Sequence, residues 1–233
     1  FKMYEGSLLF TSCCECFTMA ITIYYTLVSP PARATLIVAE MLRLTVNRRE
    51  VNLPGREHFS PEFIAKNPLH RVPVLEDGDL TITDSHAIIT YLVSKYGVGA
   101  DKQYYPKDVA ARAMVDQRLY FDATVLFPAL ASVIHGLVRY NEPLKDRQKD
   151  AIIECYDVVE KYLSVNSHIA ADYLTLADIS CITTISSLDT IIRIDEKYEK
   201  LHGWWRRLKR YDWYSELNFP GLMMFSHFIK RYL

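Results

Sequence analysis

Hydrophobic and polar positions follow two different periods along this chain of 233 residues. In the first 100 residues, short runs rich in β-branched and aromatic residues predict strands. Longer stretches between them, with apolar positions at helical spacing, predict helices. The predicted strands cover residues 21–27, 46–53, 71–75 and 80–83, and the predicted helices cover residues 32–44, 60–65 and 84–96. This order is that of a small, complete α/β domain with a four-stranded mixed sheet.

Beyond residue 97 the strand patterns fade and long helical patterns replace them. Gly97 and Gly99 mark a linker at this change. Thr175 and Asp178 have the spacing of a capping box and predict the start of one helix. The predicted helices cover residues 107–138, 144–165, 176–192, 198–210 and 220–230. We therefore expect an α+β protein in which an α/β domain of residues 19–97 precedes an all-helical domain of residues 105–233.

Residues 1–18 differ from the rest of the chain. They contain Cys13, Cys14 and Cys16, and their apolar run is interrupted by Glu15. The run is also much shorter than the ~20 residues of a membrane span. We expect an extension that is disordered or an artefact, and a targeting segment or a thiolate metal site is the alternative.

Composition narrows the classes of function. The chain is 50% hydrophobic and 24% charged, which excludes a disordered chain. Its net charge is -1, so it has no excess of cations for binding nucleic acid or an anionic membrane. Five cysteines are an odd and small number, which favours a reduced compartment, and we expect a cytoplasmic location.

The order of elements, with Pro73 in a predicted strand, suggests a thioredoxin-like fold for the first domain. A disulfide oxidoreductase would have C-x-x-C where the first strand meets the first helix. This chain has Ser29-Pro30-Pro31-Ala32 there, which argues against dithiol chemistry. What remains is the Ser29 hydroxyl at a helix N-terminus, a position that favours anions. Ser29 is either an ordinary N-cap or a hydrogen-bond donor to a bound thiolate.

Two further features allow both a structural and a binding interpretation. If the bond before Pro73 is cis, Val72 can present its backbone groups to an extended ligand. Asp84 and Ser85 begin a helix, where backbone amides suit a ligand carboxylate and the Asp84 side chain suits an ammonium group. Ordinary helix caps explain Asp84 and Ser85 equally well.

Three segments together resemble the cytosolic glutathione transferases of insects. They are Ser29–Arg33 (SPPAR), Asn67–Leu75 (NPLHRVPVL) and Asp84–Ile88 (DSHAI). The resemblance is closest to the delta and epsilon classes, and the Ser-Pro-Pro-x-Arg run favours epsilon. It covers about residues 19–220 and includes the capping motif of the helical domain at Leu174–Asp178.

The resemblance implies that glutathione is the cosubstrate and that no metal takes part. Ser29 would hydrogen-bond the glutathione sulfur. The tripeptide would be held by His58 and His70 at its glycyl end, by Val72 before a cis Pro73 at the cysteinyl unit, and by Asp84 and Ser85 at the γ-glutamyl group. The family often has Glu at this position, and the Asp84 side chain is one methylene shorter than that of Glu.

An apolar pocket for the second substrate is expected beside this site. Its candidate walls are Leu27, Pro30, Leu53, Tyr120, Thr124, Phe127, Ala131 and Phe225. Packing between helices is the alternative interpretation of the Tyr120–Ala131 stripe. Some epsilon members have an arginine where this chain has Ala131.

The predicted function is conjugation of glutathione to small hydrophobic electrophiles, a detoxification reaction, by a homodimer. Two alternatives stay open: a glutathione-dependent binder of hydrophobic ligands with little or no catalysis, and a dedicated endogenous transferase, for example in hormone synthesis. An interaction module is disfavoured, because it would not need the set that includes Ser29, His70 and Asp84.

Overall fold

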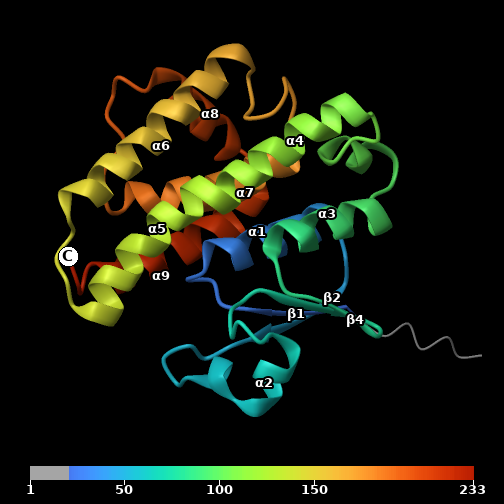
Figure 1. The fold of residues 1–233 in the computed structure, drawn as a ribbon. Helices are drawn as coiled ribbons and strands as arrows, with labels where there is room; N and C mark the ends of the chain where they lie inside the picture. The colour runs from blue at the N-terminus through green and yellow to red at the C-terminus, as the bar shows by residue number, and fades with distance from the viewer. Residues whose placement is uncertain (1–20) are drawn as a thin grey trace, which may run out of the picture.

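The computed structural model describes residues 21–233 (Figure 1), so the expectations for residues 1–18 lie outside the described residues. The N-terminal domain contains a four-stranded sheet in the order β2-β1-β3-β4. β1 pairs with β2 in parallel, whereas the β1–β3 and β3–β4 pairs are antiparallel. The predicted mixed sheet is therefore confirmed. The strands are β1 (Ile21–Tyr25), β2 (Val46–Glu50), β3 (Val74–Asp77) and β4 (Leu80–Ile82).

Helices cover both faces of this sheet. α1 (Pro30–Met41) and α3 (Ser85–Tyr96) pack side by side on the face toward the helical domain, and α2 (Pro61–Lys66) lies on the other face (Figure 1). Phe63 of α2 forms a small separate core with Val51 and Val74. α1 is therefore enclosed between the sheet and the second domain, and nine of its 12 residues are buried.

All four strands are shorter than the sequence predicts, and for β2 and β3 the reasons are local. β2 ends at Glu50 instead of residue 53, because the Asn52 amide turns away to donate to the Glu57 carboxylate at 2.7 Å. β3 begins at Val74 instead of residue 71, after a cis bond between Val72 and Pro73. Proline has no amide hydrogen to donate to a strand ladder.

The second domain is all-helical, as predicted, and its helices pack around a central one, α7. α7 has all 14 of its residues buried and contacts α1, α4, α5 and α9. The predicted capping box at its start is present, and the Asp178 carboxylate accepts hydrogen bonds from the Thr175 amide at 2.8 Å and the Trp204 indole at 2.8 Å. The helices are α4 (Val109–Phe121), α5 (Phe127–Ile134), α6 (Asp146–Val165), α7 (Leu176–Asp189), α8 (Glu199–Leu208) and α9 (Phe219–Ile229). Single π turns follow α4, follow α5 and precede α9, at Asp122–Leu126, His135–Arg139 and Tyr214–Asn218, and short 3-10 turns cover Glu57–Phe59 and Gly99–Tyr104.

The helix predicted over residues 107–138 is present as one helical stretch, Val109–Arg139, which includes two of the π turns. It is the one described helix that is long and apolar enough to cross a membrane by length and composition alone. In the structure it packs against α6 and α7 within the bundle. A core helix meets the same criteria of length and composition.

Arg33 connects the two domains. It lies on α1, is 0% exposed, and donates to the Leu27 carbonyl oxygen at 2.9 Å, within the loop between β1 and α1. In the helical domain it donates hydrogen bonds to three acceptors: the Thr183 carbonyl oxygen at 2.9 Å, the Ser187 hydroxyl oxygen at 2.7 Å and the Asn218 side-chain oxygen at 3.0 Å. Burial lowers the pKa of its guanidinium to about 9, so it stays charged at neutral pH. Its positive charge is stabilised by carbonyl and hydroxyl dipoles instead of by a carboxylate.

The close approach of α9 to this arginine depends on Gly221. A Cβ atom at that position would lie 2.4 Å from both the Arg33 Cδ atom and the Leu27 carbonyl oxygen. Any larger side chain would therefore push α9 away from α1.

Replacing Arg33 with Met is expected to lower the free energy of unfolding by about 3–5 kcal/mol, because several buried acceptors lose their donor at once. Arg33→Lys is expected to recover little of this loss, since an ammonium group cannot reproduce the planar fork. Urea denaturation measures both. Arg48→Met is the matched control, because Arg48 forms an exposed ion pair with Glu40 and should cost less than about 1 kcal/mol. An equal loss in the Arg33 and Arg48 variants would contradict the role of Arg33.

Candidate active site

The sheet topology brings the predicted glutathione-binding residues to one edge. β2 and β4 both run in the same direction as β1, and β3 runs in the opposite direction. The carboxyl ends of β1, β2 and β4 therefore lie at the same edge as the start of β3. Ser29 follows β1, His58 follows β2, Val72 precedes β3, and Asp84 follows β4.

Ser29 is the N-cap of α1, and its hydroxyl oxygen accepts a hydrogen bond from the Ala32 amide at 3.4 Å. The interpretation of Ser29 as an N-cap is therefore correct. It does not exclude the second interpretation, because a hydroxyl has one hydrogen to donate besides its acceptor lone pairs. The half-buried Ser29 can cap the helix and still donate to a thiolate.

His58 and His70 lie close together, with ring centroids 6.3 Å apart. Phe59 lies beside both rings, at 4.1 Å from His58 and 4.6 Å from His70. Burial, followed by the charges of His70 and Arg56, lowers the pKa of His58. The buried Nδ1 atom of His58 makes no hydrogen bond within residues 21–233. An unpaired polar atom at this position is suited to a polar ligand.

Asn67 fixes the turn that places His70 and the cis bond at Val72–Pro73. Its side-chain amide donates to the Arg71 carbonyl oxygen at 2.7 Å, and its side-chain oxygen accepts from the Leu69 amide at 3.0 Å. The residue is 1% exposed, so water does not compete for these bonds. The cis geometry expected before Pro73 is present.

Asp84 and Ser85 begin α3. The structure is compatible with both interpretations of this pair, as ordinary helix caps and as ligand-binding groups. Asp84 Oδ1 accepts from the amides of His86 at 2.9 Å and Ala87 at 3.0 Å. The nearby His86 ring, whose Nδ1 atom lies 3.4 Å from Asp84 Oδ1, is the main cause that lowers the pKa of Asp84. These contacts use Oδ1, which leaves Oδ2 available to a ligand ammonium group. Ser85 is 6% exposed beside it.

His86 connects this helix start to the second domain. Its Nε2 atom lies 3.0 Å from the Asp122 carboxylate of the helical domain. Its Nδ1 atom lies 3.4 Å from the Asp84 carboxylate. Ser180 of α7 also donates to Asp122. Burial lowers the pKa of His86, but the hydrogen bond to Asp122 and the nearby Asp84 carboxylate outweigh it and raise the pKa to about 9. A charged imidazolium between two carboxylates therefore orients Asp84.

The predicted walls of the second-substrate pocket differ in how much of their surface is exposed. Leu27, Leu53, Phe127 and Ala131 are partly buried, and Thr124 is exposed. Pro30 is buried at the start of α1. Phe225 is 1% exposed and packs in the main core, so it has almost no surface to offer a ligand, contrary to our expectation.

Tyr120, another predicted wall, lies on the surface of α4. It is 68% exposed and borders a space of about 280 Å³ together with Asp84, His86 and Tyr105. A π turn begins at Asp122, after Tyr120, and its i→i+5 hydrogen bonds rotate the residues that follow relative to α4. Positions chosen at a constant helical period therefore separate at this turn.

Two functional features were missed by the sequence analysis. The partners of Arg33 and His86 lie far along the chain, and no local spacing indicates them. His86 has no assigned role in the sequence, and the structure pairs its ring with Asp122.

The fold joins a thioredoxin-like domain, with a serine at the start of its first helix, to a helical bundle. This combination defines a glutathione-binding class of protein, and comparisons with known proteins agree. The N-terminal domain of glutathione S-transferases matches residues 19–94, and the C-terminal domain matches residues 110–211. Glutathione S-transferase 1 of Manduca sexta is 42% identical over 206 residues, which are 87% of this chain and 94% of that protein.

Solved structures give the same result. A glutathione transferase homolog from Drosophila mojavensis, crystallised with bound glutathione, has a TM-score of 0.88 and 40% identity, covering 91% of this chain and 97% of that chain. An epsilon-class enzyme of the housefly, Musca domestica, has the same TM-score, identity and coverage. The chain belongs to the glutathione S-transferase family, an enzyme family whose cosubstrate is glutathione. The resemblance noted in the sequence is therefore confirmed.

The His86 contacts predict a dependence of stability on alkaline pH. The pKa is raised from 6.5 to about 9, so the stabilisation is complete below pH 6.5 and is lost as the pH rises through 9. A shift of this size corresponds to roughly 3 kcal/mol. We expect the urea midpoint to fall between pH 6.5 and 9 in the parent protein, and to fall much less in His86→Gln.

His135→Gln is the control for this experiment, because His135 is exposed on a π turn away from these carboxylates. It should keep the parent pH profile. A parent-like alkaline loss in His86→Gln would show that other groups cause the dependence.

Proposed function

We propose that this protein conjugates the glutathione thiolate to small hydrophobic electrophiles, with the Ser29 hydroxyl stabilising the thiolate. The main observation in support is the position of Ser29. It lies at the N-terminus of α1 and at the sheet edge that the other predicted binding residues share. Its hydroxyl hydrogen can be donated while its oxygen accepts from Ala32. The nucleophile then belongs to the cosubstrate, and the protein only lowers its pKa.

The energies are sufficient for this role. A free thiol has a pKa of about 8.5, and lowering it by about 2 units requires about 2.7 kcal/mol of preferential stabilisation of the anion. A hydrogen bond to a charged group contributes about 1.5–3 kcal/mol, and a helix N-terminus adds about 0.3–1 kcal/mol. Ser29 and the start of α1 together reach this amount.

The remaining residues at the edge hold the tripeptide in this proposal. His58 and His70 bind the glycyl end, and the unpaired Nδ1 atom of His58 supports this assignment. The Val72 backbone pairs with the cysteinyl unit, next to the cis bond. Asp84 and Ser85 bind the γ-glutamyl group, and His86 keeps Asp84 in place.

A homodimer in the cytoplasm completes the proposal. Apolar side chains on the surface of α4 support association, because Val109, Met114 and Tyr120 are 81%, 40% and 68% exposed. Cys155 and Cys181 are free and buried, which agrees with a reducing compartment.

Light scattering is expected to give twice the chain mass of 27.0 kDa, and a single-chain mass would refute the dimer.

Replacing Ser29 with Ala is expected to lower kcat by about 10–100-fold at neutral pH, because a thiol of unshifted pKa is only a few per cent thiolate there. The KM for glutathione should change little, since the backbone and the charged contacts remain. Steady-state kinetics with a chromogenic aryl halide across pH 6–9 measures both. The pH at which the variant gains activity should rise toward the pKa of free thiol.

Ser60→Ala provides a matched control within the same chain. Ser60 precedes a proline, caps α2 and accepts from the Phe63 amide at 3.2 Å, so the substitution removes an equivalent cap away from the proposed reaction. It should lower stability by about 1 kcal/mol and leave the pH profile unchanged. Equal kinetics in Ser29→Ala and the parent would refute the thiolate role. Glutathione binding by the parent without turnover would indicate a carrier of hydrophobic ligands.

A further inference from the structure

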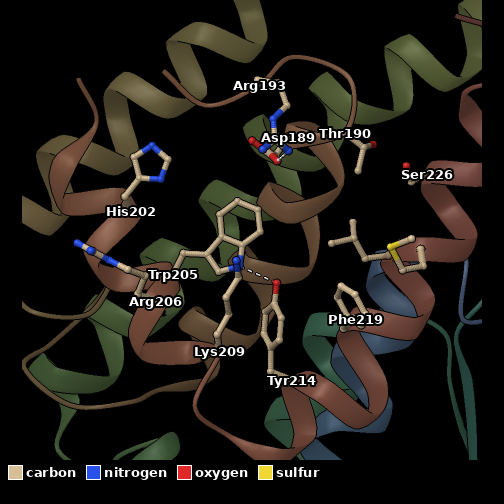
Figure 2. Close-up of a pocket in the computed structure, with 12 residues that line it drawn as sticks. Asp189, Thr190, Arg193, His202, Trp205, Arg206, Lys209, Tyr214, Phe219 and Ser226 are labelled. Atoms are coloured by element: carbon tan, nitrogen blue, oxygen red, sulfur yellow. Dashed lines mark hydrogen bonds and ion pairs between the residues drawn. The ribbon is translucent and has the colours of Figure 1, made fainter. Parts of the chain in front are cut away.

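The π turn Tyr214–Asn218 packs against α1 and leads into α9, so it lies where the helical domain meets the N-terminal domain. Its first residue is tied to α8. The Trp205 indole donates to the Tyr214 hydroxyl at 2.6 Å, and Figure 2 shows this bond beside the helix of Phe219. Trp205 and Tyr214 are 8% and 3% exposed. The position of the turn is therefore fixed from within the helical domain.

Asn218 ends this turn and bridges α1 to α7. Its side-chain oxygen accepts from Arg33 Nε at 3.0 Å, and its side-chain amide donates to the Ser186 hydroxyl of α7 at 3.3 Å. It is 0% exposed, so water does not compete for either bond. Within residues 21–233, Asn218 supplies the one acceptor of Arg33 Nε, whereas Nη2 has two acceptors on α7.

The remaining part of the guanidinium faces the loop that carries Ser29. Arg33 Nη1 donates to the Leu27 carbonyl oxygen at 2.9 Å and to the Val28 carbonyl oxygen at 3.3 Å. A guanidinium group is planar, so its bonds at Nε and Nη2 set the direction in which Nη1 points. Val28 immediately precedes Ser29, and the position of these two carbonyl groups therefore determines where the Ser29 side chain starts.

We propose that Asn218 is a positioning residue for glutathione activation. It holds Arg33, and Arg33 holds the loop at the place where the Ser29 hydroxyl can donate to the thiolate. This inference rests on the proposed role of Ser29. Because a hydrogen bond weakens steeply when its distance and angle depart from the optimum, a small displacement of the loop lowers the stabilisation of the thiolate. No group that touches glutathione needs to be removed for this effect.

The test replaces Asn218 with Leu, which has a similar shape and no acceptor. We expect the pKa of the glutathione thiol in the binary complex, followed by the ultraviolet absorbance of the thiolate, to rise by about one unit as part of a charge-assisted hydrogen bond is lost. Below both pKa values kcat should fall about tenfold, because the thiolate fraction falls by that factor. The KM for glutathione should change little. Asn218→Ala, which adds no bulk, gives the same readouts if Asn218→Leu does not fold.

Two further variants separate positioning from a general loss of stability. Asn218→Asp keeps an acceptor for Arg33 Nε, so its thiol pKa and its kcat should lie nearer to the parent values than those of Asn218→Leu. Tyr156→Phe removes a different buried hydrogen bond of the helical domain, from the Tyr156 hydroxyl to the Ile192 carbonyl oxygen at 2.8 Å. It should lower the urea midpoint and leave the thiol pKa at the parent value.

The double variant Ser29→Ala/Asn218→Leu tests whether Asn218 acts through Ser29. Its thiol pKa should equal that of Ser29→Ala, because two residues that act through one hydroxyl do not give additive shifts. Additive shifts, or an equal shift in Tyr156→Phe, would overturn the inference.

The same measurement distinguishes this inference from the proposed function. If Ser29→Ala raises the thiol pKa and the folded Asn218 variants keep the parent value, Asn218 only stabilises the fold and the role of Ser29 stands. If Ser29→Ala itself leaves the thiol pKa unchanged, both proposals are wrong.

Discussion

The buried guanidinium of Arg33 is the constraint on which the relation of the two domains depends. It joins the loop that carries Ser29 to the backbone of α7 and to Asn218 before α9. A buried charge is tolerated only when its hydrogen bonds are satisfied, so the loop, α7 and α9 must all hold their positions together. The start of α1 is therefore located relative to the helical domain by strong bonds, in addition to apolar packing.

His86 makes a second charged connection between the domains, at the start of α3. It links the Asp84 turn to Asp122, and Ser180 of α7 completes the contact. Both ends of the predicted glutathione site are thus supported by α7, Ser29 through Arg33 and Asp84 through His86. A tripeptide that bridges the two helix starts would meet a site whose width is fixed by one buried helix.

The sequence predicts the fold well, because periodicity and capping are local properties. The mixed sheet, the linker and the capping box at Thr175 and Asp178 all follow from patterns within a few residues. Pairs such as Arg33 with Asn218, or His86 with Asp122, join positions far apart and have no local signal. The stripe from Tyr120 to Ala131 is a different case, because it assumes a constant helical period and the π turn at Asp122–Leu126 changes that period without a recognisable residue pattern.

α7 also connects the two ends of the predicted glutathione site. Ser180 near its start contacts Asp122, and Ser187 near its end binds Arg33. Because all of its residues are buried, a substitution in α7 disturbs packing on every side, and a loss of activity there cannot be assigned to one site.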